Sequence, residues 1–173
     1  LHVRSRRQRQ MCIRDSDSLA GTENLLIIQD LDGVCMDLVR DPLSRALEPA
    51  YLQAALALDD HFQVLTNGEH IGSRGVNGLV ERAIGARRHC QEQGLYLPGL
   101  AAGGVQVQDR HGRISHPGVS AAELAFLAAA PAHLSASLKT LLQQAPYNLP
   151  AHDIDRLLAS SVLDNPLSPT LNL

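Results

Sequence analysis

Hydrophobic and polar positions along the chain follow a repeating order of strand and helix. Apolar runs bounded by polar or turn residues predict buried strands at 23–30, 61–68 and 94–100. Apolar residues at helical spacing predict helices between them, at 47–60 and 76–94. The first strand is a continuous apolar run, typical of a strand buried on both faces of a parallel sheet. Strand and helix alternating at this spacing predict a parallel α/β sheet.

The second half of the chain has a different pattern. Alternating apolar and polar residues around the turn DRHG predict a β-hairpin over 103–116. Helical spacing over 121–144 is interrupted at Pro131. We therefore expect an α/β protein in which residues 17–100 form part of a Rossmann-like parallel sheet, and residues 101–173 begin an α+β cap.

Composition is that of a soluble globular protein of one domain, or part of two. Of the 173 residues, 45% are hydrophobic and 19% are charged. No apolar run approaches the ~20 residues of a membrane-spanning helix, and no signal-peptide core is present, so a cytoplasmic protein without a membrane partner is expected. Cys12, Cys35 and Cys90 lack metal or redox spacing and are expected to be free thiols, and the scattered histidines predict no zinc site.

Residues 1–16 differ from the rest of the chain. They carry five arginines and one acidic residue, which by itself would suggest a basic arm for nucleic acid. The segment SRRQRQMCIRDS, however, resembles the in-frame translation of a transposase adapter oligonucleotide, so we expect residues 1–16 to be an artefact without a stable fold. Without them, 10 basic and 17 acidic residues leave a net charge of −7 rather than −3. This acidic balance argues against a nucleic-acid partner.

Two aspartates follow directly after the first predicted strand. Asp30 and Asp32 end the apolar run, and Thr66-Asn67-Gly68 ends the second predicted strand. Ligands of open parallel sheets bind beyond the carboxyl ends of the strands, so these residues meet if the two strands are neighbours. Two carboxylates at one point suit Mg²⁺, and the amides of the glycine-opened turn can hold an oxyanion.

This arrangement suggests phosphoryl transfer through a covalent intermediate. Asp30 would attack phosphorus to give an aspartyl-phosphate. Asp32 would protonate the leaving alcohol and then deprotonate the hydrolytic water. Alternatively, Asp30 and Asp32 cap a turn at the strand end, and Thr66 is a turn residue. The remaining polar candidates are expected to be solvated surface groups rather than substrate or phosphate ligands: Glu69, His70, Arg74, Arg87, Arg88 and Lys139.

LLIIQDLDGV and FQVLTNG resemble the first and second motifs of the haloacid dehalogenase superfamily of phosphohydrolases. The resemblance implies that Asp30 is nucleophile and metal ligand, and that Asp32 is general acid/base with its backbone carbonyl also on Mg²⁺. Thr66 and the adjacent amides of Asn67 and Gly68 would bind the phosphoryl group. A lid inserted after the third strand is a known arrangement in the sugar-phosphate members of the superfamily.

Longer stretches, from about residue 24 to the last residue, are similar to the glucosylglycerol 3-phosphatase family of salt-tolerant bacteria. This similarity implies a small-molecule partner, glucosylglycerol 3-phosphate, whose hydrolysis releases a compatible solute. A phosphatase for another sugar phosphate, such as a sucrose, trehalose or mannosylglycerate precursor, stays open. So does a non-catalytic module that binds a sugar phosphate.

The chain departs from the superfamily in its third and fourth motifs, a lysine and an acidic pair. Its one lysine, Lys139, lies in a predicted helix. The remaining acidic candidates precede Thr66 or lie in the lid-like tail: Asp59, Asp60, Asp153, Asp155 and Asp164. We therefore expect an N-terminal part of a phosphatase that stops inside the lid, and a poor enzyme in isolation.

Overall fold

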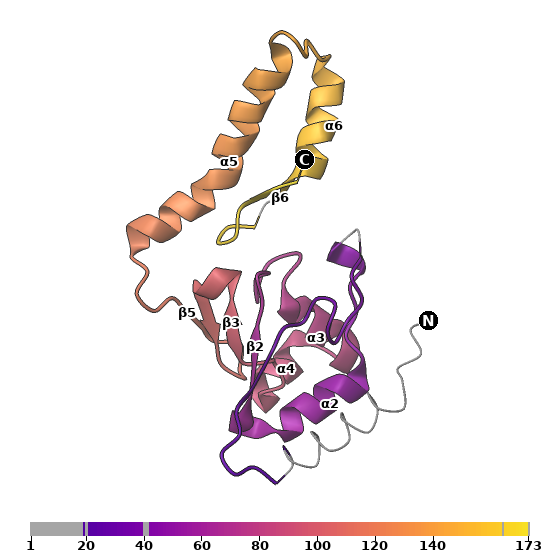
Figure 1. Ribbon diagram of the computed structural model, residues 1–173, viewed down its shortest axis with the longest axis vertical. Helices are drawn as coiled ribbons and strands as arrows, with labels where there is room; N and C mark the ends of the chain where they lie inside the picture. The colour runs from indigo at the N-terminus through magenta and orange to yellow at the C-terminus, as the bar shows by residue number, and fades with distance from the viewer. Residues whose placement is uncertain (1–18, 20, 40–41, 164, 173) are drawn as a thin grey trace.

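The computed structural model describes residues 19, 21–39, 42–163 and 165–172. The strands β1 to β5 and the helices α2 to α4 form one body, and the long helices α5 and α6 extend away from it as a pair (Figure 1). Residues 1–16 lie outside the described part, so their expected lack of a fold stays a prediction.

A five-stranded sheet runs in the order β1-β2-β3-β4-β5. Its first three strands are parallel and the last two are antiparallel. The strands are β1 (Ile27–Gln29), β2 (Phe62–Leu65), β3 (Gly99–Ala101), β4 (Gln106–Gln108) and β5 (Ile114–Ser115). The α/β class, the hairpin over 103–116 and the pairing of the first two strands are confirmed.

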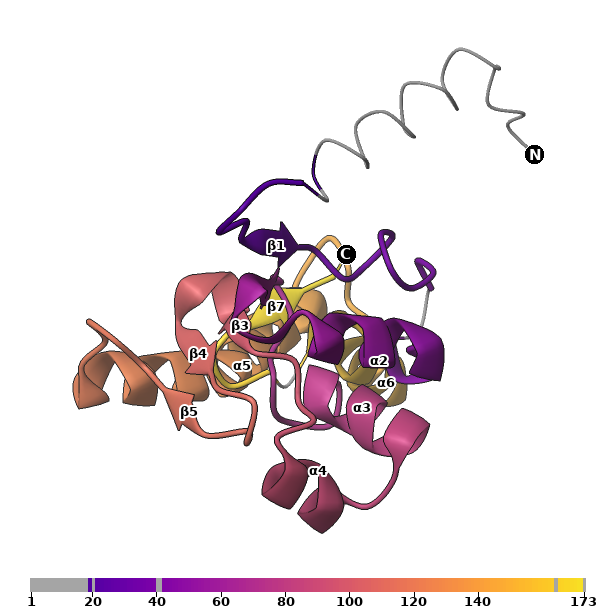
Figure 2. The same cartoon turned by 90° about the horizontal axis from the view of Figure 1, so that it is seen from below.

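Three helices lie on one side of this sheet (Figure 2). They are α2 (Pro49–Ala57), α3 (Val76–Ile84) and α4 (Arg87–Gln93), with single 3-10 turns at Pro42–Ser44 and Asp59–His61. The prediction of one helix over 76–94 was wrong, because Gly85 takes φ 140°, a conformation that favours glycine and ends α3. Gly94 ends α4 in the left-handed conformation, as helix C-caps commonly do.

The core lies between these helices and the near face of the sheet. Phe62 and Val64 of β2 are buried with Leu52, Leu79 and Val80 of the helices. The strands β2 and β3 come so close that a Cβ on Gly99 would lie 2.1 Å from the carbonyl oxygen of Val64. Only glycine therefore fits at the start of β3.

The opposite face of the sheet is open in the described residues. Side chains of a strand alternate between faces, and the register of β1 and β2 puts Ile28 and Leu65 together on this second face. They are 58% and 49% exposed, respectively. The prediction that β1 is buried on both faces was therefore wrong for this chain, because α2, α3 and α4 all cover the same face.

The second half consists of α5 (Ala121–Gln143), α6 (Ala151–Ser161) and a two-stranded antiparallel sheet of β6 (Val162–Leu163) and β7 (Thr170–Leu171). A capping box between Ser120 and Glu123 starts α5. The expected interruption at Pro131 is wrong, since α5 continues through it. No residue of α5 is buried, so water can bond the carbonyl that proline leaves without a partner.

The helix α5 is also the one described helix that is long and apolar enough to cross a membrane, judged by length and composition alone. Its 18-residue window has a mean hydropathy of 1.2, and none of that window is buried. This corrects the expectation that no segment approaches membrane-spanning length.

Candidate active site

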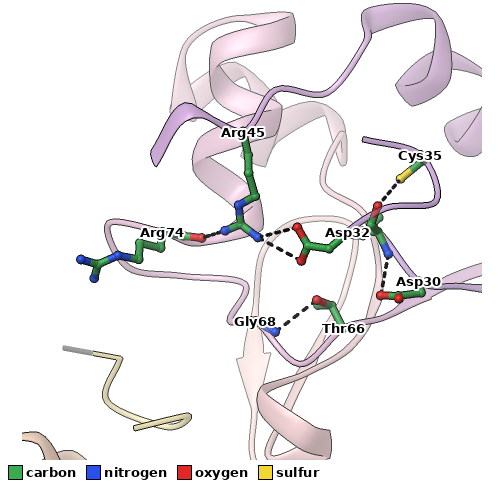
Figure 3. Close-up of polar contacts among 8 residues, drawn as sticks. Asp30, Asp32, Cys35, Arg45, Thr66, Gly68 and Arg74 are labelled. Carbon is green, nitrogen blue, oxygen red and sulfur yellow. Dashed lines mark hydrogen bonds and ion pairs between the residues drawn. The ribbon is translucent and has the colours of Figure 1, made fainter. Parts of the chain in front are cut away.

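A tight turn at the end of β1 carries Asp30 and Asp32. The carbonyl of Leu31 accepts hydrogen bonds from the amides of Val34, Cys35 and Met36, at 3.3, 3.2 and 3.3 Å. The side chain of Leu31, between the two aspartates, is fully buried in the core and so fixes the turn to the body of the protein. Both aspartates are therefore held at the carboxyl end of the strand (Figure 3).

The two carboxylates have different surroundings. Asp30 is exposed, and its Oδ1 accepts the amide of Leu31 at 2.8 Å. Both oxygens of Asp32 accept from Nη1 of Arg45 at 3.2 Å, and the Asp32 side chain is 35% exposed. One carboxylate thus faces solvent while a cation holds the other, which suits two different chemical roles.

Arg45 is a site residue that sequence reasoning missed. Its side chain is only 8% exposed, and it also donates from Nη2 to the carbonyl of Arg74 (Figure 3). A buried guanidinium needs such partners because an unpaired buried charge is costly. Its partner Asp32 lies 13 positions earlier in an irregular stretch, so no local sequence motif indicates that the two residues pair. Lys139, by contrast, is exposed and pairs with Asp155 at 3.4 Å, as expected for a solvated helix face.

The carboxyl end of β2 lies beside Asp32 and Arg45. Thr66 is buried, and its Oγ1 accepts the amide of Gly68 at 3.2 Å. A Cβ on Gly68 would lie 3.6 Å from Thr66 Oγ1 and 3.9 Å from Arg45 Nη1. Asn67, between them, is exposed. The tips of β1 and β2 therefore come together, and the loop 66–68 lies beside Arg45.

Glu69 and His70 are not solvated, and that expectation was wrong. Glu69 is 4% exposed, and its Oε1 accepts the amides of Leu167 and Ser168 at 2.8 and 2.9 Å and Ser168 Oγ at 3.1 Å. His70 is fully buried, with Nε2 3.1 Å from the carbonyl oxygen of Gly99. Burial lowers the pKa of His70 below its ordinary value.

Some of the other arginines lie on the surface as expected, and the described cysteines are free thiols as expected. Arg88 is exposed and pairs with Glu92, whereas Arg74 is half-buried beside Arg45. Cys35 and Cys90 are free, and burial raises the pKa of the Cys35 thiol, which disfavours the reactive thiolate. Cys12 lies outside the described residues.

A cavity of about 210 Å³ adjoins the site. Its walls come from the loop after β2 and from the segment that carries β6 and β7. Arg45 and Gly68 belong both to this cavity and to the residues around Asp32. The candidate site therefore continues from the strand tips into a partly open cavity that polar side chains line together with Leu163.

A family model described as glucosylglycerol-phosphate phosphatase matches residues 24–173. The chain belongs to this family. It is also 57% identical over 156 residues to a glucosylglycerol-phosphate phosphatase of Synechocystis sp.. The matched part is 90% of this chain and 37% of that relative, so the chain spans little more than a third of the relative's length.

The family match includes every residue of the candidate site. The matched residues run from just before β1, with its two aspartates, through the β6–β7 segment. The segment 1–16 lies outside the matched residues.

Proposed function

We propose that the protein containing this chain hydrolyses a glucosylglycerol phosphate to glucosylglycerol and inorganic phosphate. The observation that carries the proposal is the meeting of Asp30, Asp32 and Thr66 at the tips of two neighbouring parallel strands, beside the buried cation of Arg45. The name of the Synechocystis relative supports the substrate class. The acidic balance of residues 17–173 supports a small-molecule partner rather than nucleic acid, and we propose a cytoplasmic location.

In this proposal Asp30 is the nucleophile. Its exposed carboxylate is oriented by the Leu31 amide, and it attacks phosphorus as the bond to the leaving oxygen breaks. Asp32, which takes a proton from solvent once the substrate has displaced it from Arg45, gives this proton to the leaving alkoxide, and glucosylglycerol leaves. Asp32 then takes a proton from water, whose oxygen attacks the aspartyl-phosphate, so that phosphate is released and Asp30 is restored.

Arg45 would connect phosphate binding to the work of Asp32. Its Nη1 holds both oxygens of Asp32 before substrate arrives, and a guanidinium group also suits phosphoryl oxygens. A phosphoryl group beside Thr66 and Gly68 would compete for this donor. Asp32 would then be released for proton transfer at the moment when the substrate is bound.

We also propose a Mg²⁺ ion at the end of β1. The carboxylate of Asp30 and the carbonyl of Asp32 are oxygen donors of the kind that Mg²⁺ prefers, and the ion when bound supplies positive charge to the phosphoryl oxygens. Among the described residues, no group of three or more His, Cys, Asp or Glu side chains gathers. A tightly held ion would therefore need ligands beyond these residues.

Phosphate release by the full-length protein tests the proposed function. We expect hydrolysis of glucosylglycerol 3-phosphate in preference to sucrose and trehalose phosphates. Asp30→Asn should abolish it, and Asp32→Asn should lower it by roughly 10²–10⁴-fold, the usual contribution of general acid/base catalysis. Near-normal turnover by Asp30→Asn would exclude the aspartyl-phosphate route, and no turnover of any phosphate ester would favour the non-catalytic binding module.

A further inference from the structure

Glu69 connects two parts of the chain that are distant in sequence. Its buried carboxylate accepts hydrogen bonds only from residues 98 and 99 positions later, Leu167 and Ser168, as far as the described contacts extend. Bonds from amides to a carboxylate are stronger than those between neutral groups. Burial of a charge at this position is costly without them, so the carboxylate and the segment 165–170 are held together.

The core side of this connection is rigid. Glu69 follows the loop 66–68 directly, and its carbonyl accepts the amide of Val76 at the start of α3 at 2.9 Å. The next residue, His70, receives a second such bond from Asn77 and donates its amide to Gln106. Glu69 is therefore a fixed anchor, and the segment between β6 and β7 takes its position from it. Figure 1 shows this segment reaching back from α6 toward the end of β2.

The cavity of about 210 Å³ lies between the anchor and the anchored segment. Its core wall includes Arg45 and Asn67, and the opposite wall includes Asn165, Ser168 and Thr170. The hydroxyls of Ser168 and Thr170 already donate to Glu69 and to the Ser168 carbonyl, but both can still accept. The side-chain amides of Asn67 and Asn165 can donate and accept, so the cavity suits a ligand that carries hydroxyls. A cavity of ~150 Å³ is enough for a benzene molecule, so this one has room for part of a sugar or polyol.

We propose that Glu69 is a positioning residue that holds segment 165–170 over the phosphate loop, and that the cavity so formed binds the hydroxyl-rich part of a polyol or sugar phosphate. This inference rests on the proposed function, because it takes the phosphoryl group to lie at the Arg45 end of the cavity. Segment 165–170 then selects the leaving group, while Asp30 and Asp32 act on the phosphoryl group alone. Glu69 contributes through the segment that it holds.

The test compares two substrates in the full-length protein. Glucosylglycerol 3-phosphate has hydroxyls for the cavity, whereas the leaving group of p-nitrophenyl phosphate has none. Glu69→Ala should raise the KM for glucosylglycerol 3-phosphate about tenfold to a hundredfold, as expected for lost hydrogen bonds to a charged group. Hydrolysis of p-nitrophenyl phosphate should change less than about twofold, because its path through Asp30 and Asp32 is intact.

Further variants separate positioning from general damage. Glu69→Gln should show a smaller rise in KM, because its carbonyl oxygen can replace the one carboxylate oxygen that the described bonds use. Ser168→Ala removes one hydroxyl from the cavity wall and should raise KM for the sugar substrate alone. Glu92→Gln, the same chemical change on exposed α4, should alter neither substrate. Equal losses for both substrates, or no change in either, would overturn the inference.

Binding of the product glucosylglycerol, measured by calorimetry, tests the cavity separately from the proposed phosphatase activity. Tight binding by the native protein and about tenfold weaker binding by Glu69→Ala would support the cavity even if no ester were hydrolysed, in which case only the proposed function fails. Turnover that is normal, together with glucosylglycerol binding that is indifferent to Glu69, would overturn the cavity assignment and leave the phosphatase proposal standing.

Discussion

Arg45 is the residue on which the geometry of the site depends most. Its guanidinium bonds both oxygens of Asp32 and the carbonyl of Arg74, and it also lines the adjoining cavity. It supplies a fixed positive charge beside Thr66 and Gly68. A phosphoryl group in transfer is stabilised chiefly by such charge, so a missing lysine does not leave this end of the site without a cation.

Replacing Arg45 should therefore affect stability and activity together. Removing one partner of a buried pair costs about 3–5 kcal/mol, and because Asp32 is a third exposed, we expect about 2–3 kcal/mol for Arg45→Gln. Arg45→Lys keeps the charge but loses the fork, so it should recover part of the stability and little of the turnover. Urea unfolding and phosphate release measure the two effects. Arg88→Gln, on an exposed arginine, is the matched control and should stay within about 0.5 kcal/mol.

His70 gives the fold a dependence on pH. Burial lowers its pKa in the folded protein, so below about pH 6.5 the unfolded chain takes up a proton that the folded chain does not. Between the lowered pKa of folded His70 and about pH 6.5, stability therefore rises with pH, and below that lowered pKa both states are protonated and the dependence ends. His70→Gln keeps a donor for the Gly99 carbonyl and should flatten the profile, measured as unfolding free energy from about pH 5 to pH 7. An unchanged slope, matching that of the exposed control His89→Gln, would contradict this account.

At the scale of elements, local patterns predicted the alternation of strands and helices and the turn DRHG, because those depend on neighbours in sequence. They also predicted that Asp30 and Thr66 meet, because parallel neighbours place their carboxyl ends together. Arg45 and Glu69 were missed because their burial depends on partners 13 and 98 positions away. Pro131 was misjudged for a related reason, since its effect depends on solvent around α5 rather than on the local residue type.

The position of β1 was predicted correctly from the sequence, but its predicted burial on both faces was not observed. Its run of apolar residues predicts cover on both faces, yet Ile28 is exposed together with Leu65 of β2. Among the residues that the structure describes, β1 has a partner strand on one side only, so in that part of the chain its other edge is open. A parallel sheet is ordinarily covered on both faces. The sequence pattern of β1 therefore fits a larger sheet than the described residues form.

At the scale of the whole molecule, the exposed apolar face of β1 and the greater length of the relative both fit a sheet larger than the one that the described residues form. The chain spans 37% of the length of the Synechocystis relative. Among the described residues, the oxygens proposed to bind Mg²⁺ near Asp30 gather no third carboxylate, and Lys139 is paired with Asp155. Positioning and charge dominate phosphoryl transfer, so a site with the proposed nucleophile but few fixed charges should work slowly.

We therefore expect residues 17–173 alone to hydrolyse glucosylglycerol 3-phosphate far more slowly than the full-length protein, although Asp30, Asp32 and Thr66 are all present. The isolated chain should also associate through the open edge of β1 and the exposed face around Ile28 and Leu65. Purified samples of both lengths, assayed for phosphate release with Mg²⁺ and examined by light scattering, measure the two effects. Comparable turnover by a monodisperse 17–173 chain would mean that the described residues already contain all the charge that the reaction needs.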